Sequence, residues 1–382
     1  MSYRKIGYYT SWSIYSRGYE PKSIPAEKLT HINYAFTEIK NGEIAFTDKW
    51  ADIDKPYPED GGGPIRGNVR QLTGKSCCVH RRNPDIRVLI SIGGWSKSGQ
   101  FSIVASTPVG RRKFIISVCQ FVKIYGFDGV DIDWEYPVEG GMDENARSPD
   151  DGKNLVLLLQ ELRHQLDKMP PSQNGHRYEL SIAAPAAPLM HRHWDLFSIA
   201  KVVDFINIMA YDFEGGWSQR TGHHSCLYQP AYNPNALSVD QVVKEFLSRG
   251  VPPSKLVMGV GLYGRGFANV SPAPIHQGTD CLGVPFSGLP KGTWEEGVFD
   301  YSHLATQMLQ PDSGYTLYWD NLAKAPYLYN ANERVMITFD DINSVGWKMH
   351  YICTQQLGGV MIWELNQDRA DVLLDRMIQY LG

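Results

Sequence analysis

The chain has few cysteines, and none of them has the spacing that holds a metal ion. Its 382 residues include six, at Cys77, Cys78, Cys119, Cys226, Cys281 and Cys353. No CxxC pair occurs, which argues against a zinc site or a redox pair. Cys119 and Cys353 fall in helical patterns and are expected to be core thiols. The sequence leaves open whether Cys226 and Cys281 form a disulfide.

A block of positive charge and a long apolar run are also missing. The net charge is −4, so neither nucleic acid nor a membrane surface is indicated as a partner. No stretch is long enough to cross a bilayer, and the first residues lack the apolar segment of a signal peptide. We expect a monomer that is secreted, its signal peptide being absent from this sequence, with a cytoplasmic protein as the alternative.

Nucleotide-binding loops and metal-ligand clusters are absent as well. No GxGxxG or other phosphate-binding loop is found, which disfavours an open, doubly wound nucleotide-binding sheet. The histidines at His191 and His193, and at His223 and His224, have no carboxylate or Cys partner at ligand spacing. We expect them to be solvated loop residues. No metal and no cofactor are therefore predicted.

What the chain does have is ordinary globular composition with abundant aromatic residues. It is 43% hydrophobic and 20% charged, and it holds 10 Trp and 21 Tyr. Such a chain has ample length for a large core. Extra aromatic rings suit a sugar-binding cleft, because they stack on the apolar faces of pyranose rings, although most of them will lie in the core.

Buried β-rich runs alternate with helical patterns, which indicates parallel strands joined by crossover helices. Eight such strands are predicted, each expected to be followed by a helix, and this describes a (β/α)8 TIM barrel of the α/β class. The strands are Ile6–Ser11, Ile32–Phe36, Val88–Ile92, Gly129–Glu135, Glu179–Ala183, Phe205–Tyr211, Leu256–Leu262 and Gly359–Glu364. Helices are predicted at Arg111–Tyr125, Lys153–Lys168, Val239–Arg249, Asp341–Gln355 and Ala370–Leu381.

Two connections are longer than a crossover needs. Asn41–Asn83 is interpreted as a loop that leads into a helix. Residues 266–338, after the seventh strand, are rich in Gly, Pro and aromatic residues and contain short β-like runs. A structureless loop of this length is unusual, so we predict a small α+β insertion domain there. The barrel would then comprise residues 1–265 and 339–382.

The stretch Phe127–Pro137, FDGVDIDWEYP, carries four carboxylates in an apolar run. Side chains alternate along a strand, which predicts that Asp131, Asp133 and Glu135 share one face. Three stacked carboxylates repel one another, so at least one should keep its proton near neutral pH. The alternatives are a metal cage or a solvated acidic edge strand. Apolar spacers do not suit a calcium loop, and the sequence therefore favours catalysis.

DGVDIDWE resembles the DxxDxDxE signature of family 18 glycoside hydrolases, the chitinases, and matches it at Asp128, Asp131, Asp133 and Glu135. Two further segments are similar to motifs of this family. Ser91–Gly94 resembles SxGG, and Met209–Asp212 resembles MxYD. The resemblance extends along nearly the whole chain and implies the same barrel with an α+β insertion that deepens the substrate cleft.

The resemblance also implies a mechanism that the substrate assists. Glu135 would protonate the leaving oxygen, and the C2 acetamido oxygen of the same sugar would attack the anomeric carbon to give an oxazolinium ion. Asp133 would hydrogen-bond the acetamido N–H, and Asp131 would share a proton with Asp133. Tyr211, with Asp212 beside it, would hold the acetamido oxygen. Water would then complete hydrolysis with retained configuration.

Other residues at the strand ends would shape a cleft for chitin and chito-oligosaccharides. Trp363 would form its floor, and Tyr8 and Phe36 would wall the N-acetyl pocket. Asp128 lies off the acidic face and is expected to be structural. The remaining predicted substrate contacts are Gly94, Trp95, Met209, Arg265 and, in the insertion, Trp294.

Two other functions remain open. A chitin-oligosaccharide-binding lectin of this family would lack the terminal acid of the signature, whereas Glu135 is present here. An endo-β-N-acetylglucosaminidase acting on glycans, or an enzyme cutting peptidoglycan, would share the acidic motif. The sequence does not distinguish endo from exo cleavage.

Overall fold

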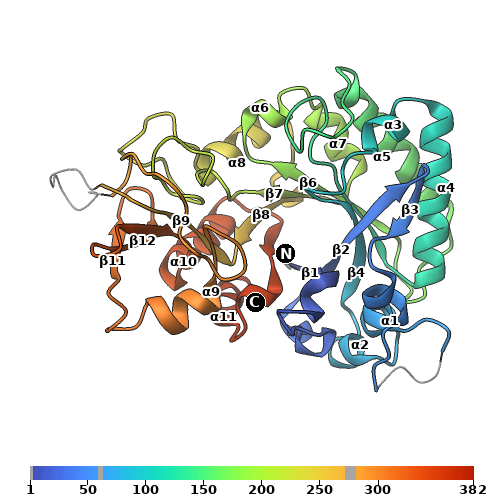
Figure 1. Ribbon diagram of the computed structural model, residues 1–382. Coiled ribbons are helices and arrows are strands. Elements are labelled where there is room, and N and C mark those ends of the chain that lie inside the picture. The colour runs from blue at the N-terminus through green and yellow to red at the C-terminus, as the bar shows by residue number, and fades with distance from the viewer. Residues whose placement is uncertain (1–2, 59–62, 272–280) are drawn as a thin grey trace. The chain divides into compact units, whose positions relative to one another are not determined.

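The computed structural model describes residues 3–58, 63–271 and 281–382 (Figure 1). Eight parallel strands form a closed barrel, which confirms the predicted fold class. They are β1 (Arg4–Thr10), β2 (His31–Lys40), β4 (Arg87–Gly93), β5 (Gly129–Asp133), β6 (Glu179–Pro185), β7 (Phe205–Met209), β8 (Leu256–Gly261) and β14 (Gly359–Trp363). The sheet order is β1-β14-β8-β7-β6-β5-β4-β2, and the pairing of β1 with β2 closes it.

The register of the central strands aligns polar residues across three of them. Asp131 on β5 pairs with Ser91 on β4 and with Ser181 on β6. Because neighbouring positions in register point to the same face of a sheet, these three side chains lie on one side of it. The apolar residues Val130 and Ile132 alternate with Asp131 and are fully buried.

The five predicted helices are present, each shifted by a few residues at most. They are α4 (Pro108–Tyr125), α5 (Asp151–Lys168), α8 (Val239–Ser248), α10 (Ile342–Thr354) and α11 (Val372–Leu381). Local sequence sets their ends. The Thr107 side chain accepts from the amide of Gly110 at the start of α4, and Gly126 ends it in the left-handed conformation. Asp341 and Ser344 form a capping box on α10.

The connection Asn41–Asn83 holds more structure than the predicted loop with one helix. It contains β3 (Glu43–Phe46), which pairs antiparallel with β2, the π-helical turn η4 (Trp50–Asp54), α1 (Gly67–Thr73) and α2 (Cys78–Arg82). Residues 59–62 lie outside the described part. Figure 1 shows α4 running beside β3. The other short helices are α3 (Phe101–Ala105), α6 (Pro188–His191), α7 (Leu196–Val202) and α9 (Tyr301–His303).

After β8, the chain forms a separate antiparallel sheet in the order β10-β9-β13-β12-β11. Its strands are β9 (Tyr263–Phe267), β10 (Val298–Asp300), β11 (Thr316–Asp320), β12 (Ala325–Asn330) and β13 (Val335–Thr338). Its strands β9, β12 and β13 contribute Phe267, Tyr327 and Met336 to one buried hydrophobic cluster. Residues 272–280 lie outside the described part, and the boundaries of an insertion domain at 266–338 stay a prediction.

The chain packs as two compact units, whose boundaries differ from those of the predicted barrel and insertion. The N-terminal unit comprises Arg4–Ile208 with Arg249–Val257, and the C-terminal unit comprises Met209–Ser248 and Met258–Gly382 with Tyr3. The barrel strands β1, β2 and β4 to β6 belong wholly to the N-terminal unit. The sheet from β9 to β13 belongs to the C-terminal unit.

Several expectations for histidine and cysteine were wrong. His191, at the end of α6, and His223 and His224, in a loop, are buried rather than solvated, because neighbouring segments cover them. Cys119 and Cys353 are partly exposed, since they lie at the borders of the apolar faces of α4 and α10. The pairing of Cys226 with Cys281 is not formed, and the two thiols belong to different buried clusters.

Among the described residues, no helix combines the length and the apolar character needed to cross a membrane. In that same part of the chain, no group of three or more His, Cys, Asp or Glu is arranged to hold a metal ion.

Candidate active site

The strand that carries the acidic residues ends two residues earlier than the predicted Gly129–Glu135. β5 ends at Asp133, so Glu135 follows the strand instead of continuing its inward face. The Asp133 carbonyl accepts from the Gly94 amide at 2.8 Å and from Ser98 Oγ at 3.1 Å. The Glu135 amide donates to Ser98 Oγ at 2.9 Å. These bonds take the place of the sheet ladder and fix the backbone that carries Glu135, which is 8% exposed.

Asp131 is fully buried and accepts hydrogen bonds from four strands. Its donors are Tyr8 Oη at 2.6 Å, Ser91 Oγ at 2.8 Å, Ser181 Oγ at 2.6 Å and Asn207 Nδ2 at 3.4 Å. Burial raises the pKa of Asp131, and the hydrogen bonds oppose that rise. All four donors are neutral groups, so the carboxylate acts in this arrangement as an acceptor held inside the barrel.

Asp133 stands in a different environment, although it lies only two residues further along β5. Burial raises its pKa well above the ordinary range, and the negative charges of Glu135 and Asp131 raise it further. Within the described part of the chain, Asp133 Oδ1 has no hydrogen-bond partner. Asp133 therefore holds a proton more tightly than an ordinary carboxyl group and titrates together with its acidic neighbours.

The SxGG segment supports this arrangement through its backbone. Gly93 and Gly94 have φ of +110° and +78°, a region that glycine enters without strain. A Cβ atom on Gly94 would lie 2.5 Å from the Phe36 ring, so the residue must be glycine for Phe36 to pack there. The next residue, Trp95, is 55% exposed and is available for stacking.

The MxYD segment lies at the end of β7, in the C-terminal unit. Met209 is partly buried, and Tyr211 is buried with its ring at right angles to that of Tyr263, the centroids being 6.2 Å apart. Asp212 has φ of +60°. Its Oδ1 accepts from Tyr263 Oη at 2.6 Å and from Arg265 Nε at 2.8 Å, and its Oδ2 accepts from Arg265 Nη2 at 2.7 Å.

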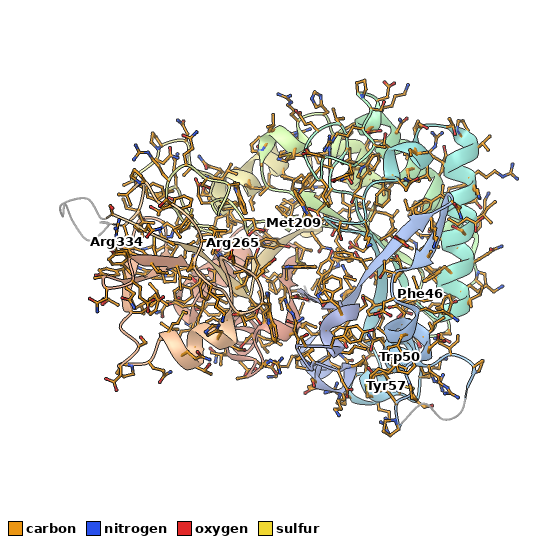
Figure 2. All side chains as sticks on the ribbon, viewed as in Figure 1. Phe46, Trp50, Tyr57, Met209, Arg265 and Arg334 are labelled. Atoms are coloured by element: carbon orange, nitrogen blue, oxygen red, sulfur yellow. The ribbon has the colours of Figure 1, made fainter. Side chains whose placement is uncertain are left out.

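Asp212 is consequently a carboxylate with its oxygens already engaged. Burial alone would raise its pKa, but the charge of Arg265 and its hydrogen bonds lower the pKa below the usual value. Arg265, labelled in Figure 2, also lies over the Trp217 ring at 5.0 Å from its centroid. The bidentate pair fixes the guanidinium plane, as such pairs do in general.

The remaining predicted residues occupy varied positions. Trp363 ends β14 and is partly buried. Trp294 is 48% exposed, and its Nε1 donates to Asp300 Oδ2 at 2.7 Å. Asp128 is fully buried and accepts from Ser172, Asn174 and the Val88 amide, which agrees with the expectation that it is structural.

Comparison with known proteins now adds to this geometry. The sequence matches Glycosyl hydrolases family 18 over residues 4–368. The chain belongs to this family. It is 39% identical over 415 residues to "Chitinase A1" of Niallia circulans. This alignment covers 98% of this chain and 58% of that protein.

Two solved structures of family 18 proteins are also similar. "Chitinase ChiA74 from Bacillus thuringiensis" has a TM-score of 0.90 at 32% identity, over 100% of this chain and 70% of that one. A "glycoside hydrolase family 18 N-acetylglucosaminidase from Paenibacillus barengoltzii" has a TM-score of 0.80 at 33% identity, over 99% of both chains. The chain is therefore a glycoside hydrolase of family 18, and it spans a little over half the length of the Niallia circulans relative.

Four residues of this family 18 site are missing from the sequence prediction. Ser181 and Asn207 were overlooked because single polar residues in apolar strands carry little signal, although their inward positions on β6 and β7 are readable once Asp131 is known. Ser98 follows the SxGG segment in a turn with no sequence mark. Tyr263 directly follows the predicted seventh strand, and its bond to Asp212 could not be read from spacing.

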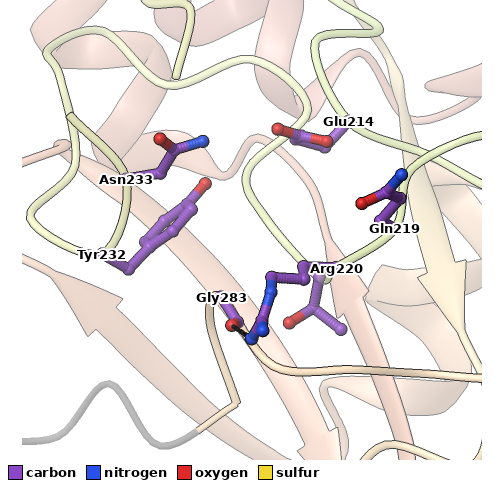
Figure 3. Close-up of a pocket in the computed structure, with 7 residues that line it drawn as sticks. Glu214, Gln219, Arg220, Tyr232, Asn233 and Gly283 are labelled. Carbon is purple, nitrogen blue, oxygen red and sulfur yellow. Dashed lines mark hydrogen bonds between the residues drawn. The ribbon is translucent and has the colours of Figure 1, made fainter. Parts of the chain in front are cut away.

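A pocket of about 390 Å³ lies elsewhere in the C-terminal unit of this family 18 chain (Figure 3). It is lined by Glu214, Gln219, Arg220, Thr221, Tyr232, Asn233 and Gly283. None of the predicted site residues lines it. Arg220 Nη1 donates to the Gly283 carbonyl at 2.8 Å, so the guanidinium is already partly engaged by the protein.

Proposed function

We propose that this chain hydrolyses β-1,4-linked N-acetylglucosamine polymers with retained configuration, by substrate-assisted catalysis. The observation that carries the proposal is the contrast between two buried aspartates on β5. Asp131 is engaged by four donors, whereas Asp133 has a strongly raised pKa and a free Oδ1 among the described residues. Similar chains named as chitinases support the substrate class.

The first step breaks the glycosidic bond. Glu135 gives its proton to the leaving oxygen while the acetamido oxygen of the same sugar attacks the anomeric carbon. The electron pair of the broken C–O bond goes to the leaving oxygen, and a cyclic oxazolinium ion forms. Asp133 shifts its proton towards Asp131 and accepts a hydrogen bond from the acetamido N–H, where positive charge develops. The charges balance, because Glu135 becomes a carboxylate as the oxazolinium cation forms, and the second proton moves only from Asp133 to Asp131.

The second step consumes the intermediate. Glu135, now ionised, takes a proton from water, and the water oxygen attacks the anomeric carbon from the face that the leaving group vacated. The acetamido group is released, and configuration is retained. Tyr211 has a hydroxyl that can donate to the acetamido oxygen. Asp212 cannot take that role as a carboxylate, since it has no proton to give, and it serves Arg265 and Tyr263 instead.

Other residues would bind the rest of the sugar chain. Trp363 and Trp95 offer ring faces, and Phe36 and Tyr8 offer the walls of an N-acetyl pocket. Gly94 would let the backbone approach the sugar closely. Met209, Arg265 and Trp294 are proposed to contact more distant parts of the sugar chain. For the residues of the C-terminal unit, these roles are proposed because the residues lie at the ends of strands or within the family motifs.

A proton NMR time course on N-acetylglucosamine hexamer tests the proposal. Products that appear first as the β-anomer are expected, and Glu135→Gln should nearly abolish turnover while the hexamer still binds. Fresh α-anomer would contradict retention. Binding without cleavage by the unaltered protein would favour the lectin function, and a near wild-type rate for Glu135→Gln would remove this residue as the acid.

A second function, release of N-acetylglucosamine units from chain ends, is favoured by one finding. The similar Paenibacillus barengoltzii protein is described as an N-acetylglucosaminidase. The same time course distinguishes the two activities, because an exo-acting enzyme yields monomer from the first minutes whereas an endo-acting one yields dimers to tetramers. An N-glycan substrate tests the endo-β-N-acetylglucosaminidase alternative.

We further propose that the protein acts outside the cell as a monomer on chitin. The substrate is an extracellular polymer, which motivates the location, and the acidic net charge of −4 gives nucleic acid no evident surface to bind. Detection of the protein in the culture medium of its source, and a mass near that of one chain by light scattering, would support both points.

A further inference from the structure

The C-terminal unit contains an ion pair that is completely shielded from solvent. Lys348, on α10, is 0% exposed, and its Nζ lies 2.5 Å from Asp340 Oδ2. Asp340 also accepts from Ser225 Oγ at 2.7 Å and from Ser344 Oγ at 2.6 Å. Burial alone would raise the pKa of Asp340, yet the charge of Lys348 lowers it below the usual value. The carboxylate form of Asp340 is therefore favoured beside Lys348.

Stability gives little reason for such a pair. Two charges lose their hydration on burial, and their attraction often only balances that cost. Replacing a buried ion pair by uncharged side chains of similar volume is commonly neutral or stabilising, whereas removing one partner alone is strongly destabilising. A role in holding neighbouring groups in place is the alternative that its contacts allow.

Those contacts lead from α10 to the MxYD segment. Ser225 donates to Asp340, and its Oγ lies 3.3 Å from His224 Nε2. The His224 ring is 5.3 Å from the Tyr263 ring, centroid to centroid. Tyr263 in turn donates to Asp212 at 2.6 Å. A continuous series of contacts thus joins Lys348 to Asp212, the residue that follows Tyr211; the contacts are buried as far as Tyr263, and the Asp212 side chain is partly exposed.

His224 occupies the middle of this series as a neutral ring. It is 0% exposed, and burial lowers its pKa to about 4, with the nearby charges of Asp340, Asp212, Lys348 and Arg265 acting in opposite directions. The imidazole therefore lies between two ion pairs, Lys348–Asp340 and Arg265–Asp212, without carrying charge itself. Packing and one hydrogen bond, rather than charge, transmit any displacement from one pair to the other.

We propose that the buried Lys348–Asp340 pair is a positioning device for Asp212, acting through Ser225, His224 and Tyr263. The pair anchors Ser225 and so fixes the His224 ring against Tyr263. Tyr263 then holds the Asp212 carboxylate in the orientation that Arg265 requires. Lys348 and His224 are positioning residues in this scheme, since neither touches substrate. The catalytic part of the test rests on the proposed hydrolase function.

The decisive variant is the uncharged pair Asp340→Asn with Lys348→Met, which preserves volume and leaves an acceptor for Ser225. We expect urea unfolding close to that of the unaltered protein and a kcat on N-acetylglucosamine hexamer roughly 10- to 100-fold lower, the scale of a small misplacement, with KM within about threefold. The Asp212 carboxyl, followed by ¹³C NMR and assigned with Asp212→Asn, should titrate at higher pH.

His224→Asn gives an independent arm, and the adjacent His223→Asn is its matched control. His223 is also buried, but it contacts Asp320, Tyr232 and Tyr327 instead of Tyr263. We expect the loss of kcat and the shift of the Asp212 titration for His224→Asn and not for His223→Asn. Both substitutions remove an imidazole of nearly the same burial, so a general loss of packing would affect them alike.

Three results would overturn the proposal. An Asp212 titration unchanged in the uncharged pair would show that no coupling exists, and this result does not depend on hydrolysis. A kcat that falls only in proportion to the unfolded fraction would make the pair purely structural. Equal effects of His223→Asn and His224→Asn would remove the specific path. If the unaltered protein does not hydrolyse the hexamer, the proposed function fails while the NMR titration still decides the positioning role.

Discussion

The backbone amide of Glu135 donates to the side chain of Ser98 at 2.9 Å, and Ser98 Oγ donates to the Asp133 carbonyl at 3.1 Å. One buried hydroxyl therefore ties together the two residues assigned to proton transfer and to substrate orientation. Ser98 is 0% exposed, so water cannot readily replace it. The position of Glu135 depends on a residue 37 places earlier in the chain.

Ser98→Ala should reduce kcat roughly 10- to 100-fold while KM changes little. The Glu135 amide would be left buried without its acceptor, which costs about 1 to 3 kcal/mol, and the backbone would shift to find another. Steady-state kinetics on N-acetylglucosamine hexamer measures the change. Ser102→Ala is the matched control, because Ser102 is also buried but donates to Asp151. A similar fall in kcat for that variant would point to general destabilisation.

Gly94→Ala should destabilise the fold by about 2 to 4 kcal/mol, because it combines positive-φ strain with overpacking. Its Cβ would lie 2.5 Å from the Phe36 ring. Gly175→Ala isolates the first cause, since Gly175 has φ of +83° with nothing within 4 Å of its Cβ, and it should cost about 1 kcal/mol. Urea unfolding measures the loss of stability in both variants. Equal losses would mean that the Phe36 ring moves aside without cost, which would contradict the overpacking.

Asp52→Asn should alter how stability depends on pH. Asp52 is 1% exposed, and burial raises its pKa to about 7 despite hydrogen bonds from Tyr34 and the Asp48 amide. The folded-state pKa lies above the unfolded value near 4, so the stability that the protonated acid contributes is fully present below about pH 4 and is lost as pH rises from about 4 to about 7.

Asparagine does not titrate, so the variant should gain roughly 3 kcal/mol on the unaltered protein between pH 5 and pH 8. Urea unfolding across that range measures the difference. Asp54→Asn, on the same short helix with a side chain that is 46% exposed, serves as the control. Parallel pH curves for Asp52→Asn and the unaltered protein would contradict a neutral Asp52.

Asp133→Asn should slow turnover roughly 10- to 1,000-fold, the scale for losing a transition-state hydrogen bond. The pH–rate profile should also lose one of two coupled ionisations, because the carboxylate that interacts with Glu135 is gone. Asp128→Asn is the matched control within the same motif: it breaks a buried network around Ser172 and Asn174. Asp128→Asn should lower the free energy of unfolding, while the folded molecules of this variant should turn over substrate at the unaltered rate.

Tyr211→Phe should likewise reduce kcat roughly 10- to 1,000-fold, because a donor to the acetamido oxygen is lost in the transition state. The Phe ring keeps the packing against Tyr263, so thermal stability should stay nearly constant. An unchanged kcat would leave no role for the hydroxyl.

The strands of the barrel were predictable because each is a short apolar run with buried neighbours. Gly129–Asp133 illustrates this, since Val130 and Ile132 mark it in the sequence. The strand's end was not predictable. Period-two alternation continues through Trp134 and Glu135, but hydrogen bonds to the Gly94 amide and to the Ser98 side-chain hydroxyl replace the ladder there. Such long-range bonds leave no trace in local sequence.

The buried histidines show the same limit. His223 and His224 follow a Gly in a polar segment, which is typical of a solvated loop. They are buried because the chain places Asp320, Tyr263 and Asp340 around them from positions 39 to 117 residues away. By contrast, Asp133 and Tyr211 could be proposed as site residues from the sequence, because each stands in a short motif of adjacent positions.

The four donors around Asp131 also bear on how the chain is made. Tyr8 precedes the carboxylate by 123 residues, whereas Asn207 follows it by 76. A chain emerging from the ribosome can therefore complete this cluster only after Asn207 has been synthesised. Until then Asp131 must stay hydrated, and the half-built barrel exposes its strand edges. Contacts of such long sequence separation form slowly, so this stage of synthesis is where the chain is most open to aggregation and to chaperones.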